Sequence, residues 1–166
     1  MERAKKILVA GLGNEYMGDD GFGPRVIEAL MARDDLPEGV EARDAGLCGV
    51  TLAPELNDYK LVIFVDAVQR GEKPGTIYRN EIKAEQVEVR KPEEAMDFFT
   101  FSVHETRLEE LLIFARAIGT LPPTTIVIGC EVREITLGET LSPEVDAAVP
   151  RAVELILDEL SHSEKY

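Results

Sequence analysis

Three side chains that could bind a divalent metal ion stand far apart in the sequence, each at the boundary of an expected element. Asp20 lies in the glycine-rich segment 11–23, Asp66 follows the apolar run 61–65, and His104 lies in the first turn of an expected helix whose N-cap is Ser102. Two carboxylates and one imidazole suit zinc, nickel or a similar ion, with positions left for water or a substrate ligand. The sequence therefore contains a candidate metal site, although it has no His-Glu-x-x-His motif.

Each of these residues also has a simpler structural role open to it. Asp20 could cap the helix that follows it, a role worth about 1 kcal/mol. Asp66 could accept hydrogen bonds from neighbouring loop amides. His104 lies inside Ser102-Val103-His104-Glu105, which has the form of a helix capping box, and could simply cover the helix start. The positive end of that helix disfavours imidazolium, so the ring stays neutral and able to bind a metal.

The elements that must position these residues alternate along the chain between apolar runs and segments of helical spacing. The expected strands cover residues 7–10, 40–45, 61–68, 76–82 and 125–130, and the expected helices cover 21–33, 50–56, 103–118 and 142–160. This order predicts an α/β fold, a three-layer α/β/α sandwich whose twisted sheet is mostly parallel, with strand 76–82 antiparallel at one edge. Pro150 is expected to kink the last helix or displace its register.

In such a sheet, functional residues gather at the carboxyl ends of the strands. Asp20 and Asp66 both belong to that edge. We therefore expect them to converge, together with His104, on one pocket.

Composition restricts the class of protein. The chain has 166 residues, the size of a single domain over 1–166 with a polar tail at 161–166. Its 18 Lys and Arg against 32 Asp and Glu leave a formal charge of -14. Such a surface repels nucleic acid and anionic membranes, and the apolar runs are too short to span a bilayer. With only two cysteines, a cytoplasmic location is expected, and we expect a monomer.

Phosphate binding by the glycine-rich segment is disfavoured. Tyr16 stands where a dinucleotide-binding motif needs its third glycine. Glu15, Asp19 and Asp20 would also repel a pyrophosphate placed at the start of the next helix.

Two other catalytic arrangements remain open. Cys48 could pair with His104 as nucleophile and base, although a lone thiol is more often buried or incidental. Asp44-Ala45-Gly46 resembles half of an aspartic dyad, and Asp66 as its partner would give an acid pH optimum. None of the four serines lies in a nucleophile elbow.

Taken together, the motifs resemble those of the maturation endopeptidases of nickel–iron hydrogenases. Gly11-Leu12-Gly13-Asn14 with Asp19-Asp20 matches the family's first motif, and Val65-Asp66-Ala67 matches its second. The Pro74-Gly75-Thr76 turn, Ser102-x-His104 and the region 140–150 follow in the same order and spacing. The resemblance covers nearly the whole chain.

The resemblance implies a peptidase that removes a short C-terminal extension from the precursor of a hydrogenase large subunit after nickel has been inserted. It implies that Asp20, Asp66 and His104 bind metal and carry catalysis, either by recognising the nickel of the substrate or by holding an ion of their own such as zinc. Asp44 would assist as a positioning or proton-handling carboxylate.

The family's Asp-Gly-Gly-Thr segment appears here with Leu47 in place of the small polar residue, which affects the local substrate contacts. A nickel- or zinc-binding assembly chaperone without hydrolysis is the alternative that the sequence leaves open. A small-molecule α/β hydrolase is a further one.

Overall fold

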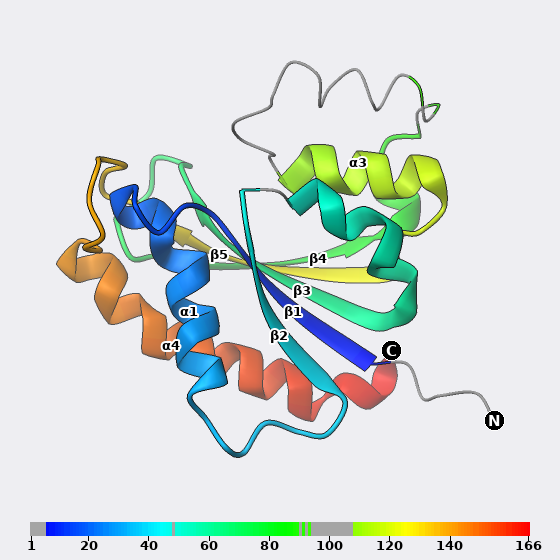
Figure 1. The fold of residues 1–166 in the computed structure, drawn as a ribbon, viewed down its shortest axis with the longest axis horizontal. Helices are drawn as coiled ribbons and strands as arrows, with labels where there is room; N and C mark the ends of the chain where they lie inside the picture. The colour runs from blue at the N-terminus through cyan, green and yellow to red at the C-terminus, as the bar shows by residue number, and fades with distance from the viewer. Residues whose placement is uncertain (1–5, 48, 90, 92, 94–107) are drawn as a thin grey trace.

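A twisted five-stranded sheet forms the middle layer of the computed structural model, which describes residues 6–47, 49–89, 91, 93 and 108–166 (Figure 1). Its strands are β1 (Lys6–Leu12), β2 (Val40–Gly46), β3 (Tyr59–Val68), β4 (Ile77–Lys83) and β5 (Thr124–Glu131). Their order is β2-β1-β3-β5-β4, and only the pairing of β4 with β5 is antiparallel among these strands. The predicted mostly parallel sheet with one antiparallel edge strand is confirmed.

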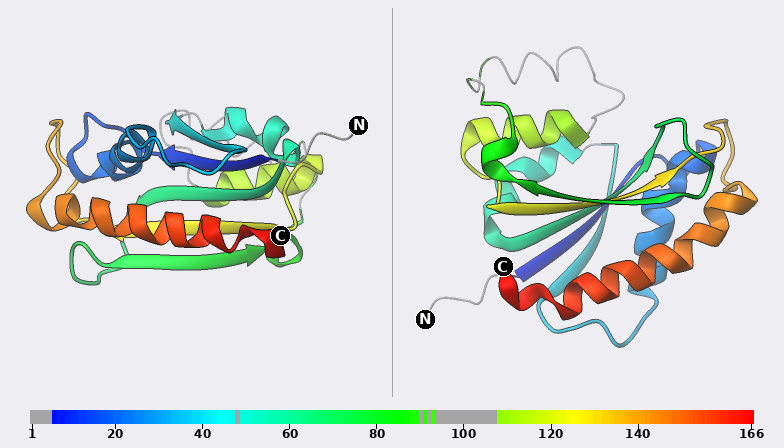
Figure 2. Two further views of the ribbon diagram at one scale, coloured as in Figure 1. Left: turned by 90° about the horizontal axis from the view of Figure 1, so that it is seen from below. Right: turned by 180° about the vertical axis from the view of Figure 1, so that it is seen from behind.

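Helical segments cover both faces of the sheet (Figures 1 and 2). One face carries α1 (Phe22–Met31) and α4 (Pro143–Ser161), and the other carries the 3-10 segment η2 (Gly49–Asp58) and α3 (Leu108–Ile118). Each face has its own cluster of buried apolar side chains. The predicted three-layer architecture is therefore confirmed. The shorter 3-10 turns are η1 (Gly18–Gly21), η3 (Ala84–Gln86) and η4 (Ser163–Lys165).

The central strand β3 explains how a carboxylate comes to the edge of this core. Leu61, Ile63 and Val65 are fully buried in one apolar cluster, and Val62 and Phe64 are fully buried in the other. An unbroken apolar run is typical of a parallel strand covered on both faces. Asp66 comes directly after this run, so it lies where the strand leaves the core.

A close approach between α1 and the sheet sets the position of the β1–α1 loop. A Cβ atom at Gly23 would lie 2.2 Å from the Leu12 carbonyl oxygen and 2.7 Å from that of Val65. Only glycine allows this contact, which places the first turn of α1 against the ends of β1 and β3. The η1 turn, which immediately precedes α1, is thereby held at the same edge as Asp66.

The observed elements differ from the predicted ones in a few places. Residues 50–56 were expected to form a short helix, and they form 3-10 turns, with Pro54 inside the segment. Helix α4 runs from Pro143 to Ser161 with Pro150 inside it, and the expected kink or register shift at Pro150 stays a prediction. Ser142 is its N-cap but makes no capping bond, because its hydroxyl donates to Asp19 instead. The predicted capping box at 102–105 lies outside the described residues.

No helix within the described ranges is long and apolar enough to cross a membrane.

Candidate active site

The β1–α1 loop (13–21) and the β5–α4 loop (132–142) lie together at the carboxyl end of the parallel strands (Figure 1). The Gly18 amide donates to the Gly138 carbonyl at 2.8 Å, and the Gly138 amide donates to the Tyr16 carbonyl at 2.8 Å. The β1–α1 loop carries Asp20, and the neighbouring end of β3 carries Asp66. Both predicted carboxylates therefore lie at the edge where α/β proteins place functional residues.

Asp20 lies in η1, and its side chain stabilises the β1–α1 loop by a hydrogen bond within that loop. Its Oδ2 accepts a hydrogen bond of 2.9 Å from the Asn14 amide. Gly13, with φ +121°, lets the chain fold back so closely that a Cβ there would lie 2.1 Å from the Asp20 carbonyl oxygen. The N-cap of α1 is Gly21, which has no side-chain capping bond. The simpler interpretation of Asp20 as the cap of α1 is therefore wrong.

Among the carboxyl groups described at this edge, Asp66 has the most strongly shifted pKa. Burial, and to a lesser extent the negative charge of Asp20, raise its pKa from 3.8 to about 7, against a smaller opposing effect of the Ala67 amide. The charge of Asp20 thus acts on Asp66, although the two residues lie on separate elements far apart in the sequence. A divalent cation between them would relieve this repulsion, so the pair fits a cation.

Asp44 lies apart from this pair. It is exposed near the end of β2, and its Oδ1 accepts a hydrogen bond of 2.9 Å from the Gly46 amide. Both Asp44 and Val65 are in register with Gly11 of the intervening strand β1. Two strand spacings, about 10 Å, therefore separate the backbones of β2 and β3 here. The carboxylate that acts on Asp66 is Asp20, so the structure gives no support to an Asp44–Asp66 dyad.

His104 and Cys48, the remaining predicted participants, lie outside the described residues. Among the described residues, no three His, Cys, Asp or Glu side chains lie together in a group that could hold a metal ion. The three-ligand site therefore stays a prediction. Helix α3, which begins at Leu108, precedes the parallel strand β5, so its first turn faces the carboxyl end of the sheet (Figure 1).

The other cysteine is a poor nucleophile. Cys130 is fully buried on β5, and burial raises the pKa of its thiol to about 12. A thiol that stays protonated at neutral pH does not attack a carbonyl.

Sequence reasoning missed the role of Asp19. This side chain is 1% exposed, and it accepts hydrogen bonds from the amides of Arg133, Glu134 and Ser142 at 2.8, 3.1 and 2.7 Å, and from the Ser142 hydroxyl at 2.8 Å. Burial alone would raise its pKa, but these hydrogen bonds outweigh burial and lower it. Asp19 thus joins the β5–α4 loop to the turn that carries Asp20. In the sequence, the only indication of this role was that Asp19 is a second acidic residue directly before Asp20.

Glu131 has a similar role at the next loop. It is 2% exposed and accepts hydrogen bonds from the Arg70 amide at 3.0 and 2.9 Å and from the Glu72 amide at 2.5 Å. It holds the β3–β4 connection beside the end of β5.

Gly18 allows the two main loops to touch. It has φ +57°, and a Cβ there would lie 3.1 Å from the Thr136 carbonyl oxygen and 3.2 Å from the Thr136 amide. We expect Gly18→Ala to lower the free energy of unfolding by about 1–2 kcal/mol, through backbone strain and this contact. Urea unfolding measures the change. The control is Gly39→Ala, at φ +83° with open space around it, which carries the strain without the contact; equal losses for the two variants would contradict the importance of the contact.

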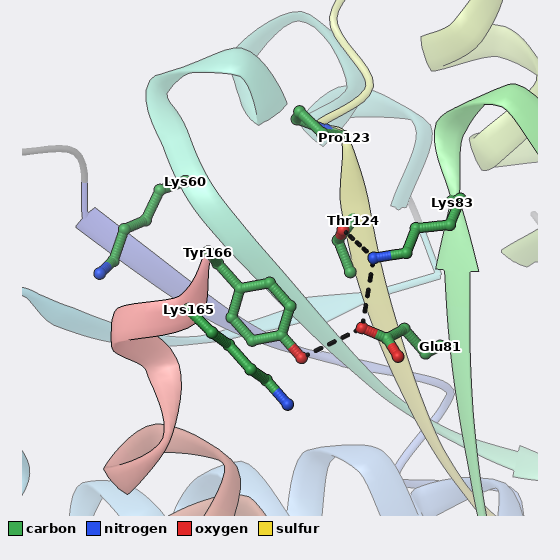
Figure 3. Close-up of a pocket in the computed structure, with 7 residues that line it drawn as sticks. All are labelled: Lys60, Glu81, Lys83, Pro123, Thr124, Lys165 and Tyr166. Carbon is green, nitrogen blue, oxygen red and sulfur yellow. Dashed lines mark hydrogen bonds and ion pairs between the residues drawn. The ribbon is translucent and has the colours of Figure 1, made fainter.

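A separate hollow of about 320 Å³ lies at the opposite, amino end of β3 and β5 (Figure 3). Lys83 there donates to the Thr124 hydroxyl at 2.9 Å, and the Tyr166 hydroxyl donates to Glu81 at 3.2 Å. Because this hollow is at the other end of the sheet, it is not part of the candidate site.

Comparison with known proteins agrees with this geometry. Residues 24–159 match the family model described as hydrogenase maturation protease. The hydrogenase 2 maturation protease of Escherichia coli is 30% identical over 95% of this chain and 92% of its own length.

Solved structures also match over nearly the whole chain. The hydrogenase 2 maturation peptidase of a Thaumarchaeota archaeon is 42% identical, with a TM-score of 0.73, covering 95% of this chain and 99% of the other. The hydrogenase maturating endopeptidase of E. coli is 27% identical, with a TM-score of 0.74, covering 95% of this chain and 93% of the other.

Proposed function

This chain belongs to the family of hydrogenase maturation proteases, and we propose that it removes the C-terminal extension of a nickel–iron hydrogenase large-subunit precursor after nickel insertion. It is a hydrolase of peptide bonds. The observation that carries the finer proposal is the pair Asp20 and Asp66, which come from separate elements and act on each other at the carboxyl end of the sheet. Two partly buried carboxylates that repel each other at the carboxyl end of the sheet are suited to meet a cation carried by another protein.

We assign Asp20, Asp66 and His104 as the residues that meet the nickel of the substrate. Asp20 and Asp66 offer oxygen donors, and His104 would add an imidazole nitrogen. His104 stands four residues before α3, whose first turn faces the same edge. This supports the assignment of His104 as the third ligand. Asp44, which is exposed near the end of β2, would contact or orient the substrate chain rather than share a proton with Asp66.

A resident ion such as zinc is the second form of the same proposal. Such an ion would supply an activated water for attack on the scissile carbonyl. In either form Asp20 and Asp66 hold negative charge in place, and the buried Asp19 fixes the turn that presents Asp20.

The proposal also covers the location, the oligomeric state and the partner of the protein. We place the protein in the cytoplasm as a monomer whose partner is the precursor, without nucleic acid or membrane. The formal charge of -14 supports this exclusion of polyanionic partners.

Mass analysis of a nickel-loaded precursor tests the proposal. The precursor is incubated with the wild-type protein and with Asp20→Asn, and the intact mass is followed with time. We expect the wild type to remove the extension and Asp20→Asn to be slower by at least about 100-fold, because a metal-facing carboxylate is lost. Asp34→Asn, outside the loops of the site, is the control and should process normally. An unchanged precursor mass with the wild type would leave a non-hydrolytic role as assembly chaperone.

A further inference from the structure

We propose that the exposed side chains of Tyr16, Ile135 and Leu137, with the hollow beside them, form a docking surface for a basic, amphipathic segment of the hydrogenase precursor. The inference rests on the proposed function, and it specifies what the precursor presents to the protease besides its nickel centre. We call these three residues the docking surface.

Exposed apolar side chains concentrate at the end of the molecule that carries the candidate site. In the part of the chain that the structure describes, the exposed large apolar residues are Tyr16, Met31, Leu47, Val89, Ile135 and Leu137. Four of these six lie on loops at the carboxyl ends of β1, β2 and β5. Leu137 is 87% exposed and Tyr16 is 54% exposed. Grouped apolar side chains on an otherwise acidic surface mark an interaction site.

The docking surface is held by hydrogen bonds before any partner arrives. The amide of Gly138, next to Leu137, donates to the carbonyl of Tyr16 at 2.8 Å, which ties the two loops together beside these side chains. The Asp19 carboxylate holds the amides on either side of the β5–α4 loop, at Arg133 and Ser142. A preformed surface loses little conformational entropy on binding.

A hollow of about 340 Å³ adjoins the docking surface. Leu137 and Leu141 provide its apolar lining, and Thr136, Thr140 and Gly18 provide polar and backbone groups. A space of this size can accept one large side chain of a bound segment. It opens beside Asp19, which is next to Asp20 in η1.

The charge around the docking surface indicates a basic partner. The two loops, residues 13–21 and 132–142, contain five acidic residues and a single Arg or Lys, Arg133. Arg133 is itself paired with Glu144 at 3.2 Å. Glu15, the stronger cause, and Glu139 both raise the pKa of the Tyr16 hydroxyl, which places their carboxylates around it. Lysine or arginine side chains that flank an apolar anchor would complement the carboxylates of Glu15 and Glu139.

The test is the steady-state kinetics of extension removal from the nickel-loaded precursor. We expect Leu137→Ser to raise KM by about 10-fold and to leave kcat within about twofold, because the lost contacts hold the ground state and the transition state equally. The thermal midpoint should stay unchanged, since the Leu137 side chain is exposed. Glu139→Gln should weaken the dependence of kcat/KM on salt concentration.

Met31→Ser is the matched control. Met31 is 65% exposed at the end of α1, at the opposite edge of the sheet, and its replacement should leave KM unchanged. A Leu137→Ser variant that processes like Met31→Ser overturns the docking surface, while wild-type cleavage in the same assay keeps the proposed function. A Leu137→Ser variant that alters only the oligomeric state, as seen by light scattering, also overturns it, since the surface would then join two copies of this chain. Failure of the wild type to cleave counts against the proposed function instead.

Discussion

Replacing Asp66 by Asn is expected to stop extension removal and at the same time to stabilise the fold at pH 8. A pKa raised from 3.8 to about 7 means that the folded protein disfavours the ionised carboxylate by about 4 kcal/mol. Asn has the shape of the neutral acid and removes this penalty. It also removes a negative oxygen that we assign to the nickel, so processing should fall by at least about 100-fold.

The stabilisation depends on pH in a defined direction. Because the folded state binds the Asp66 proton more tightly than the unfolded chain does, its contribution to stability is fully present below about pH 4 and is lost as pH rises to about 7. The wild type and Asp66→Asn should therefore have nearly equal unfolding free energies at pH 4. They should differ by up to about 4 kcal/mol at pH 8.

Urea unfolding at both pH values measures this difference. Asp44→Asn is the matched control, because Asp44 is exposed and its amide replacement can still accept the Gly46 hydrogen bond. It should change stability by less than about 0.5 kcal/mol at either pH. An Asp66→Asn protein that is less stable than the wild type at pH 8 would show that the carboxylate is satisfied rather than repelled.

Removing the Asp19 carboxylate is expected to give the largest loss of stability among the acidic residues of the site. Asp19→Ala leaves the amides of Arg133, Glu134 and Ser142 without their acceptor. Each lost partner of a buried donor costs about 1–3 kcal/mol, and water can reach part of this loop, so we expect a loss of about 3–5 kcal/mol. The β5–α4 loop should also show faster amide exchange, because the side chain that holds it is gone.

Hydrogen exchange and urea unfolding together test this expectation. Asp35→Ala is the control, since Asp35 is paired only at the surface with Arg33, at 2.8 Å, and such pairs contribute little. Because the pKa of Asp19 is lowered, its contribution should be present above pH 3.8 and should decline as the pH falls further. Unchanged exchange at 132–142 in Asp19→Ala would contradict the role of this residue.

The layered fold could be predicted because the strands can be recognised from local sequence, either as unbroken apolar runs or by the turn that precedes them. The run 61–65 is apolar on both faces, which only a covered parallel strand allows, and the Pro74-Gly75 turn predicted the antiparallel strand β4. The segment 50–56 was predicted less well, because its apolar spacing resembles that of a helix, whereas Pro54 lacks the amide that a helix interior needs.

The site could be predicted only in part. The rule that parallel strands end at one edge was enough to expect Asp20 and Asp66 together. It could not separate Asp20 from Asp19, because adjacent residues of a 3-10 turn point in different directions and the burial of one depends on a loop more than a hundred residues away. Asp44 follows the same rule, yet an intervening strand keeps it from Asp66.

The binding of the precursor with and without nickel tests the central claim most directly. Titration calorimetry would compare the nickel-loaded and nickel-free precursor on the wild-type protein and on Asp20→Asn, under conditions where cleavage is slow. If Asp20 and Asp66 meet the nickel, the wild type should bind the loaded precursor at least about 10-fold more tightly, and Asp20→Asn should bind both forms alike. Equal affinity of the wild type for the two forms would contradict the account.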